Sequence, residues 1–266
     1  MAEFNKILIV GCGNMGGAML AGWLAAGFDP SRFVVVDPLL AEGPAGVELH
    51  RELPQREFDT IVLGVKPQLL GDVAPQLSRI AGSETIVLSI LAGVELASLA
   101  KRFPEAKAMV RIMPNLAAAI GKSPVALFAH GLEEFERTAV TELMQPLGPP
   151  EWLAAENQFD LVTALAGSGP AFVYRFIDAL ASGAAALGLP AEQAQRLALA
   201  TVEGAAALAA ASPHGPGELA RRVASPGGTT EAGLKVLDAD QALADLVAAT
   251  LKAAADRSAE MAAAAR

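Results

Sequence analysis

A short run in the C-terminal half of the chain carries the groups best suited to bind a small anion. Residues 225–231 read Ser-Pro-Gly-Gly-Thr-Thr-Glu and place three hydroxyls and two adjacent glycines before an amphipathic segment predicted as a helix. Glycine lets the backbone approach a ligand closely, and the free amides and positive dipole end of a helix favour a carboxylate. The alternative is a plain helix start, in which Thr229 or Thr230 caps the first turn and Glu231 complements the dipole.

A second motif, near the N-terminus, predicts a dinucleotide site. Residues 6–10 have the apolar character of a buried strand and lead into Gly-Cys-Gly-Asn-Met-Gly at residues 11–16. An Ala- and Leu-rich helix is predicted over residues 17–26, and a second strand over residues 33–36 that ends at Asp37. This order of strand, glycine loop, helix, strand and acid is typical of proteins that bind a dinucleotide. A purely structural turn is the alternative.

Each glycine of this loop has an expected task. Gly11 makes the tight turn, Gly13 lets a pyrophosphate meet the backbone, and Gly16 allows close packing of the helix on the strand. The predicted cofactor-binding loop consists of Gly11, Cys12, Gly13, Asn14, Met15 and Gly16.

Asp37 bears on which dinucleotide is bound. A carboxylate at this position accepts hydrogen bonds from a ribose 2'-hydroxyl and repels a 2'-phosphate. No arginine follows it closely, although Arg32 could fold in from the preceding loop. The sequence therefore favours NADH over NADPH, and a turn formed by Asp37 with Pro38 is the alternative role of this residue.

The motifs contain no obvious histidine base. Enzymes that oxidise alcohols take a proton from oxygen, usually with His or Lys. His50, His130 and His214 lie in polar or loop-like stretches outside the motifs, and we expect them at the surface. A cyclic imine needs no such base, because protonation of its nitrogen already makes the neighbouring carbon electrophilic.

Five motifs, in their order and spacing, resemble those of the pyrroline-5-carboxylate reductase family over the whole length of the chain. They are the loop at residues 11–16, Val-Lys-Pro at 65–67, Met-Pro-Asn at 113–115, Gly-Ser-Gly-Pro at 167–170 and Ser-Pro-Gly-Gly-Thr-Thr at 225–230. The last of these, followed by Ala-Gly-Leu, is the most specific. The chain departs from the family pattern at Leu116, Ala117, Ala166 and Gly215, which affects details of the pocket.

The resemblance implies NAD(P)H-dependent hydride transfer to the C=N carbon of 1-pyrroline-5-carboxylate, which gives L-proline in the last step of proline biosynthesis. We expect the backbone amides of Gly227, Gly228 and Thr229 to hold the substrate carboxylate, assisted by Ser225. The resemblance also implies that Thr230 lies nearest the ring nitrogen and hydrogen-bonds it as its charge changes. Thr230 and Ser225 are therefore the predicted catalytic residues.

The remaining cofactor contacts are predicted on loops that follow strands. The resemblance implies that Val65, Lys66 and Pro67 shape the nicotinamide pocket. Lys66 either flanks the cofactor or is an exposed lysine in a turn that Pro67 fixes. Asn115 either holds the nicotinamide carboxamide or orders the turn after Pro114.

Two other functions stay open at this point. A ketimine or imine reductase acting on a six-membered ring would share every cofactor residue and differ in the size of its pocket. A non-catalytic dinucleotide-binding dimer is the second alternative, although such a protein needs no carboxylate site.

Composition excludes several classes of protein. A net charge of -9 argues against nucleic-acid binding. The single cysteine, Cys12, excludes an internal disulfide and a multi-cysteine zinc site, and we predict no metal site. With no leader-like N-terminus, this cysteine usage predicts a cytoplasmic protein. The apolar stretch at residues 161–189 is interrupted by Pro170, Arg175 and Asp178, so we expect no membrane span.

The expected fold is α/β: an N-terminal Rossmann-type, doubly wound and mostly parallel sheet, followed by an all-helical domain. The predicted domains are residues 1–155, which bind the dinucleotide, and residues 156–266, which dimerise and bind substrate. Further strands are predicted at residues 60–64, 85–90, 108–112 and 125–128. Breaks at residues 167–170, 188–190, 212–217 and 225–228 divide the Ala-rich second half into about five helices.

The helical half predicts a homodimer. Its small alanine side chains provide little core volume, so we expect its apolar surface to be buried against a second copy. The resemblance implies that the C-terminal helices of two subunits interleave, that one subunit's cofactor domain and its partner's helical domain form the active site, and that higher assemblies of dimers occur.

Overall fold

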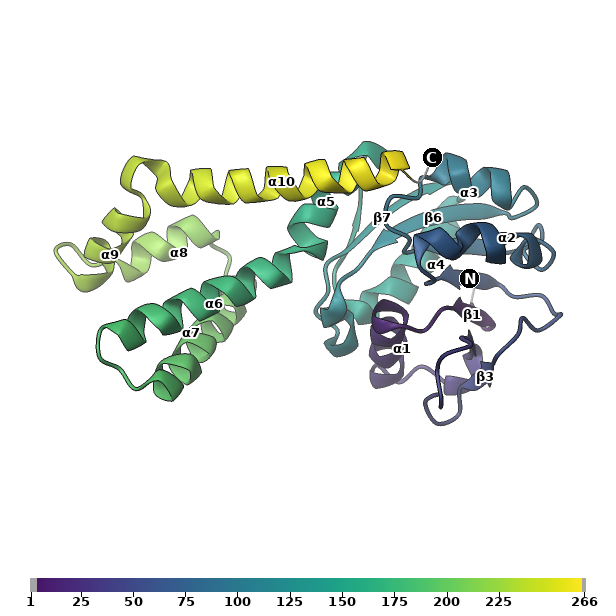
Figure 1. The fold of residues 1–266 in the computed structure, drawn as a ribbon, viewed down its shortest axis with the longest axis horizontal. Helices are drawn as coiled ribbons and strands as arrows, with labels where there is room; N and C mark the ends of the chain where they lie inside the picture. The colour runs from purple at the N-terminus through teal and green to yellow at the C-terminus, as the bar shows by residue number, and fades with distance from the viewer. Residues whose placement is uncertain (1–3, 265–266) are drawn as a thin grey trace. The chain divides into compact units, whose positions relative to one another are not determined.

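The structure is a computed structural model that describes residues 4–264. The chain forms two compact units (Figure 1). The first runs to Gly167 and also includes the C-terminal stretch from Ala254, whereas the second is Ser168–Ala253. The predicted domain boundary at residue 155 stays a prediction.

A single eight-stranded sheet forms the centre of the first unit as far as the structure describes it. Its order is β3-β2-β1-β4-β5-β6-β7-β8, and all neighbours are parallel except the antiparallel pair β6 and β7. The strands are β1 (Ile7–Val10), β2 (Phe33–Val36), β3 (Glu48–His50), β4 (Thr60–Leu63), β5 (Ile86–Ser89), β6 (Ala108–Met113), β7 (Val125–His130) and β8 (Pro150–Trp152). The predicted mostly parallel, doubly wound sheet is confirmed.

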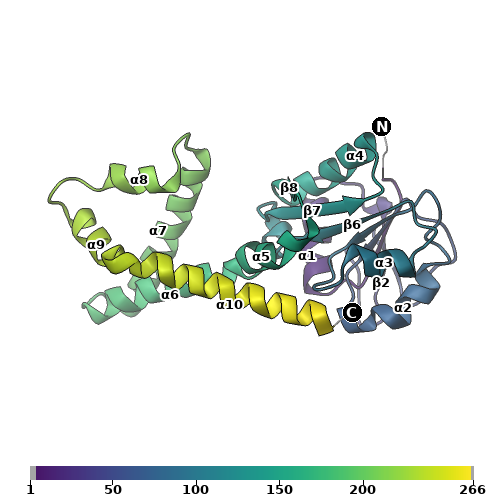
Figure 2. The ribbon, with the colours of Figure 1, turned by 90° about the horizontal axis from the view of Figure 1, so that it is seen from above.

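Helices cover both faces of this sheet. The helices α1 (Asn14–Ala25) and α4 (Glu134–Met144) pack on one face, and α2 (Leu70–Leu77) and α3 (Leu96–Arg102) pack on the other. Figure 2 shows α4 on one side of the strands and α2 and α3 on the opposite side. Every residue of β1, β2, β4 and β5 is buried. This explains why these strands read as continuous apolar runs rather than alternating ones.

The position of α1 is fixed by large side chains and close backbone packing. The Trp23 ring stacks on Phe33 of β2 with centroids 5.4 Å apart, and its Nε1–H donates to the Leu143 carbonyl at 2.7 Å. A Cβ added to Gly22 would lie 2.2 Å from the Ala118 carbonyl oxygen. The start of α1, where the glycine loop lies, is therefore held rigidly against the sheet.

Two strands were not predicted. Both β3 and β8 are three residues long, and they are the two edge strands of the sheet. Their residues are exposed or half-buried, so they lack the apolar run that marks the central strands.

The second half of the chain is helical, as predicted. After α5 (Phe159–Val162) and a π-helical turn (Thr163–Gly167) come α6 (Gly169–Ala186), α7 (Ala191–Ala211), α8 (Pro216–Val223), α9 (Thr229–Leu237) and α10 (Ala242–Ala264). The four predicted breaks coincide with the ends of these helices. A fifth break, before α10, was not predicted, and there Asp240 and Gln241 adopt positive φ angles of 50° and 60°.

The C-terminal end of α10 packs on the first unit. Ser258 donates its hydroxyl to Asp160 Oδ1 at 2.7 Å, and a Cβ added to Gly93 would lie 3.0 Å from the Ala262 Cα. The last turns of α10 thereby lie against α5 and the loop that follows β5.

The second unit has almost no core of its own. Its only buried residues are three alanines, Ala181, Ala194 and Ala198. Many large apolar side chains are exposed instead, among them Tyr174, Phe176, Leu187, Leu197, Leu199, Leu208 and Leu246.

Two negative findings concern the residues the structure describes. None of their helices has the length and apolar character needed to cross a membrane. Nor do these residues bring together three or more His, Cys, Asp or Glu side chains that could hold a metal ion.

Candidate active site

The glycine loop forms where the carboxyl ends of β1 and β4 meet. Gly11 adopts a φ of +86°, and its amide donates to the Val36 carbonyl at 2.9 Å. A Cβ at this position would lie 2.7 Å from the Val65 nitrogen. The tight turn therefore requires glycine, both for its dihedral angle and for the space between the two strand ends.

Gly13 and Gly16 have the steric surroundings expected of them. A Cβ on Gly16 would lie 2.5 Å from the Gly11 carbonyl oxygen, whereas a Cβ on Gly13 would meet no atom within 4 Å. A methyl group on Gly13 would clash with no protein atom, but it would fill space that a bound ligand could occupy. Gly13 is also the N-cap of α1 and provides no side-chain cap, so the first amides of the helix remain available to an anion. The loop therefore fits a dinucleotide pyrophosphate.

Asp37 ties this loop to the end of β2. Its Oδ2 accepts the Cys12 amide at 2.8 Å, and its Oδ1 accepts the amides of Leu39 at 2.8 Å and Leu40 at 3.3 Å. The turn role left open for this residue is thus present, and Oδ2, which accepts one hydrogen bond, keeps a further lone pair for a ribose hydroxyl. Whether it binds ribose stays a prediction.

Arg32 does not reach this site. Its Nε donates to the Phe4 carbonyl at 3.0 Å, and its guanidinium lies 4.9 Å from the centroid of the Phe28 ring. The possibility that Arg32 folds in beside Asp37 is therefore not realised, because the Phe4 carbonyl and the Phe28 ring hold its guanidinium.

Cys12 is a packing residue of the loop. It is buried. Its burial, and to a smaller extent the negative charge of Asp37, raises the pKa of its thiol. The thiol accordingly stays protonated near neutral pH and is a poor nucleophile.

The loop after β4 carries the next predicted residues. Val65 lies against Gly11, and Lys66 is exposed and precedes the short 3-10 helix η2 (Pro67–Leu69). The exposed lysine matches the structural alternative for Lys66, and its contact with a cofactor stays a prediction.

Asn115 is buried, and both ends of its side chain are engaged within the chain. Its Oδ1 accepts the Ala117 amide at 2.9 Å, and its Nδ2 donates to the Ala166 carbonyl in the π-helical turn at 2.9 Å. The Asn115 amide itself donates to the Ser123 hydroxyl at 2.7 Å. These contacts match the alternative in which Asn115 orders the turn after Pro114. They also connect that turn to the π-helical segment that precedes α6.

An ion pair in the first unit, between a buried arginine and a half-buried glutamate, was not predicted from the sequence. Arg111 Nη1 lies 2.9 Å from Glu156 Oε1, and the guanidinium lies 4.2 Å from the centroid of the Phe159 ring. Glu156 also accepts the Leu96 amide at 2.8 Å. The pair joins β6, the start of α3 and the 3-10 helix Glu156–Gln158 that precedes α5, and its members are 45 residues apart, so no local pattern reveals it.

In the second unit, the Ser-Pro-Gly-Gly-Thr-Thr turn leads into α9 as predicted. Gly228 is the N-cap of α9 without a side-chain cap, so Thr229 and Thr230 are its first two helical residues. The hydroxyls of Ser225, Thr229 and Thr230 form no hydrogen bond with any residue in the described part of the chain. The alternative in which a threonine caps the helix is therefore wrong, and binding of a ligand by these hydroxyls stays a prediction.

The backbone of this turn already binds one carboxylate. Glu231, in the first turn of α9, accepts the Gly227 amide, and Gly227 has a φ of +73°. This hydrogen bond, and to a smaller extent the one from the Lys235 side chain, holds the pKa of Glu231 below its ordinary value. The Gly228 amide donates to the Ser225 carbonyl at 2.9 Å. Two of the three amides predicted for substrate thus have partners within the chain.

The histidines lie outside these sites. His130 is exposed, and His50 and His214 are half-buried. His50 Nε2 lies 2.5 Å from Glu48 Oε1. All three lie outside the glycine loop and the turn before α9, and that no histidine acts as the base stays a prediction.

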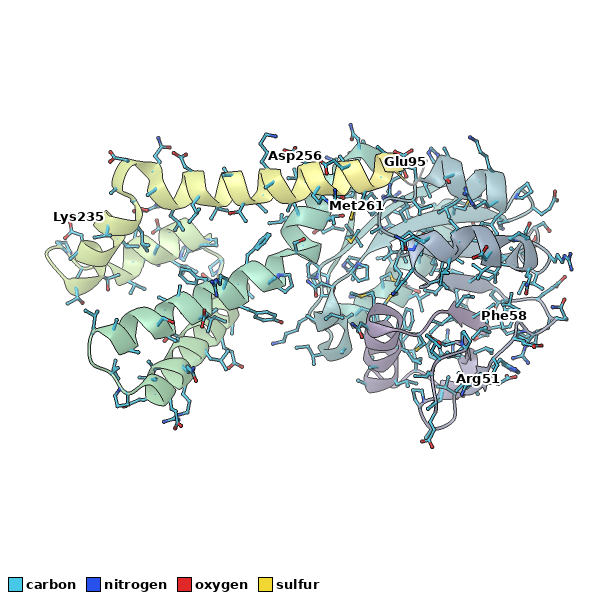
Figure 3. The ribbon with its side chains drawn as sticks, viewed as in Figure 1. Arg51, Phe58, Glu95, Lys235, Asp256 and Met261 are labelled. Carbon is cyan, nitrogen blue, oxygen red and sulfur yellow. The ribbon has the colours of Figure 1, made fainter. Side chains whose placement is uncertain are left out.

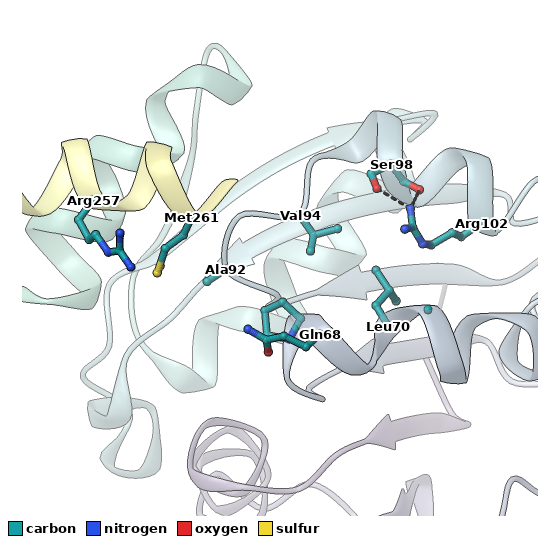
Figure 4. A pocket seen from close by; sticks show the side chains of 10 residues that line it. Gln68, Leu70, Ala92, Val94, Ser98, Arg102, Arg257 and Met261 are labelled. Atoms are coloured by element: carbon teal, nitrogen blue, oxygen red, sulfur yellow. Dashed lines mark hydrogen bonds between the residues drawn. The ribbon is translucent and has the colours of Figure 1, made fainter. Parts of the chain in front are cut away.

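One cavity of the first unit has no residue of the glycine loop in its wall. It has a volume of about 630 Å³ and lies among α2, α3 and the end of α10, with Gln68, Arg102, Arg257 and Met261 in its wall (Figure 4). Pro67 is the one predicted site residue that lines it.

Comparisons with protein families cover most of the chain. Residues 156–261 match the family described as pyrroline-5-carboxylate reductase dimerisation, and residues 6–93 match the family described as NADP oxidoreductase coenzyme F420-dependent. The helical region and the glycine loop thus fall in separate family matches.

Individual relatives match over nearly the full length. A pyrroline-5-carboxylate reductase of Pseudomonas aeruginosa is 35% identical over 97% of both chains. One of Aquifex aeolicus is 38% identical over 88% of this chain and 89% of its own. Among solved structures, a pyrroline-5-carboxylate reductase of Coxiella burnetii has a TM-score of 0.90 at 32% identity, covering 97% of this chain and 98% of that one.

Proposed function

This chain belongs to the pyrroline-5-carboxylate reductase family, and from that premise we propose which of its residues carry out the reaction. The enzyme is an oxidoreductase that uses a nicotinamide dinucleotide to reduce the cyclic imine 1-pyrroline-5-carboxylate to L-proline. It thereby serves the last step of proline biosynthesis.

The glycine loop is proposed to bind the pyrophosphate of the cofactor. The free amides at the start of α1 and the open space over Gly13 support this. Val65, Lys66 and Pro67 follow β4 at the same edge of the sheet and are proposed to shape the nicotinamide pocket. When bound, the reduced nicotinamide supplies the hydride that the imine carbon accepts.

The turn before α9 is proposed to bind the substrate carboxylate. The observation that carries this proposal is the set of three hydroxyls, on Ser225, Thr229 and Thr230, that have no partner within the described chain, at an uncapped helix N-terminus. The Thr229 amide and the Ser225 hydroxyl supply the first contacts. The Gly227 amide already donates to the carboxylate of Glu231. It can donate to the substrate carboxylate instead when the Glu231 side chain adopts another rotamer.

Thr230 is proposed to act on the ring nitrogen. Its hydroxyl can donate or accept, so it can follow the nitrogen as the charged imine becomes an amine. Thr230 holds the nitrogen while solvent delivers the proton, and the chain needs no histidine base for this step.

The dinucleotide preferred by the enzyme is proposed to be NADH. Asp37 lies at the carboxyl end of β2, where a carboxylate pairs with a ribose 2'-hydroxyl, and its two oxygens are held in place by the Cys12 and Leu39 amides. A 2'-phosphate at this point would meet the negative charge of Asp37.

The enzyme is proposed to be a homodimer in the cytoplasm, with larger assemblies built from the dimer. A second unit that buries only three alanines and exposes many large apolar side chains needs a further surface to cover it. The match of residues 156–261 to a dimerisation family supports a second copy as that surface. A free, buried cysteine fits a reducing compartment.

The proposed carboxylate site predicts strong discrimination between two five-membered imines. We expect kcat/KM for 1-pyrroline-5-carboxylate to exceed that for 1-pyrroline, which lacks the carboxylate, by about 100-fold or more, because two or more charged hydrogen bonds are lost. Steady-state oxidation of NADH with each imine measures this ratio. Similar kcat/KM values for the two imines would remove the carboxylate from the function of the turn.

A further inference from the structure

Arg51 follows β3 at the sheet edge where the adenosine ribose is expected. The strands β2 and β3 are parallel, and Val36 and His50 are their last paired residues. The Asp37 amide continues this pairing and donates to the His50 carbonyl at 3.1 Å. Asp37 and Arg51 are therefore neighbours on adjacent strands, each one residue past the end of its strand.

The Arg51 guanidinium lies across the loop that follows β2. Its Nη1 donates to the Asp37 carbonyl at 3.1 Å and the Pro38 carbonyl at 3.0 Å, and its Nη2 lies 3.4 Å from the Ala41 carbonyl. Three carbonyls therefore hold the group in place. Figure 3 labels Arg51 on this edge of the first unit.

The positive charge of Arg51 has no carboxylate partner among residues 4–264, and the side chain is exposed. A guanidinium has five N–H donors, of which the three carbonyls take three, so two remain. The neighbouring arginines are committed elsewhere: Arg32 binds the Phe4 carbonyl, and Arg56 pairs with Glu48. Arg51 is thus the available cation beside Asp37.

A guanidinium fork matches the geometry of a phosphate, and its charge offsets that of a nearby carboxylate. An arginine near the acid after β2 is also the feature that accommodates a 2'-phosphate in this kind of site. We propose that Arg51 binds the 2'-phosphate of NADPH and so lets this enzyme use NADPH in addition to NADH, against the charge of Asp37.

This inference rests on the proposed dinucleotide site and extends it to a residue that the sequence did not single out. The carbonyls of the loop after β2 already fix the position of the guanidinium.

The test is calorimetric titration with 2',5'-ADP and with 5'-AMP, which differ only in the 2'-phosphate. In the unchanged protein we expect both to bind, with 2',5'-ADP weaker than 5'-AMP by no more than about 10-fold, in keeping with a preference for NADH that still allows NADPH. Arg51→Gln is expected to raise the Kd of 2',5'-ADP relative to that of 5'-AMP by about 10-fold, in line with loss of a charged hydrogen bond at an exposed site. Arg51→Lys keeps the charge but loses the two-pronged guanidinium. Its ratio of the two Kd values should lie between that of the unchanged protein and that of Arg51→Gln.

Arg56→Gln is the matched control, because it removes the same charge from an exposed arginine five positions further along, which is paired with Glu48. It should leave the ratio of the two Kd values within about 2-fold. Binding of 5'-AMP to Arg51→Gln shows in the same experiment that the site is still folded.

The outcomes separate this inference from the proposed function. A ratio of Kd values that is the same in Arg51→Gln and the unchanged protein overturns the role of Arg51, whatever the enzyme reduces. Failure of the unchanged protein to bind either nucleotide overturns the dinucleotide site and Arg51 together. Binding with the expected ratios, but without turnover of the imine, supports Arg51 and contradicts the proposed function.

Discussion

Replacing Thr230 with valine is expected to lower kcat for 1-pyrroline-5-carboxylate by about 10- to 1,000-fold, the range found when one hydrogen-bonding group that stabilises a transition state is deleted. Valine keeps the branched shape of threonine and removes only the hydroxyl, which has no partner within the described chain. The Kd of NADH should change little, because the predicted cofactor residues belong to the first unit and Thr230 belongs to the second. Steady-state kinetics and fluorescence titration with NADH measure the two quantities.

Thr229→Val is the matched control for this prediction. It makes the same chemical change one residue earlier, also in the first turn of α9. The proposed role of Thr229 uses its backbone amide, which the substitution keeps, so its loss of kcat should be clearly smaller. Equal losses in the two variants, or an unchanged kcat in Thr230→Val, would exclude a specific role of the Thr230 hydroxyl in turnover.

Gly16→Ala has the second large expected effect, on cofactor binding and on stability together. The added methyl would lie 2.5 Å from the Gly11 carbonyl oxygen, so α1 or the glycine loop must move. We expect the Kd of NADH to rise by about 10-fold or more and the free energy of unfolding to fall by about 1–3 kcal/mol, the usual cost of overpacking. Denaturant unfolding and titration with NADH measure these changes.

Gly17→Ala tests whether the effect is specific to position 16. A Cβ at Gly17 would lie 3.6 Å from the Cys12 carbonyl oxygen, an ordinary contact. Alanine inside a helix is favoured over glycine by about 0.5–1 kcal/mol, so this variant should be as stable as the original or more so. If Gly16→Ala behaves like Gly17→Ala, close packing at Gly16 is not what the loop requires.

The central strands could be predicted because they are buried on both faces. Apolar runs such as Ile-Leu-Ile-Val in β1 and Phe-Val-Val-Val in β2 read directly as strands, and the observed bounds agree closely with those expected. By contrast, β3 contains Glu48 and His50 and is only three residues long, so its sequence resembles a loop. It forms a strand because it pairs in parallel with β2.

The missed β3 explains the missed Arg51. Without that strand, nothing in the sequence places residue 51 beside Asp37, 14 positions earlier. The same holds for Arg111 and Glu156, whose contact depends on how β6 and the start of α5 meet in space. Residues that meet only through the tertiary fold leave no periodic trace in the sequence.

The glycines of the two motifs were easier to interpret, since their roles follow from backbone geometry alone. The positive φ of Gly11 and Gly227 and the close contact at Gly16 are properties of the local turn. Asn115 shows the limit of such reasoning. Its type and position allowed a ligand contact or a turn contact, and only the fold reveals that its Nδ2 faces the Ala166 carbonyl.

The size of the imine ring that the enzyme reduces distinguishes a pyrroline-5-carboxylate reductase from a ketimine reductase. The measurement is oxidation of NADH and NADPH, followed at the nicotinamide absorbance, with 1-pyrroline-5-carboxylate and with its six-membered analogue in parallel. We predict rapid turnover of the five-membered imine, with NADH preferred and NADPH accepted. Turnover of the six-membered imine alone would make the enzyme a ketimine reductase, and no turnover of either ring would leave a dinucleotide-binding protein and contradict the account.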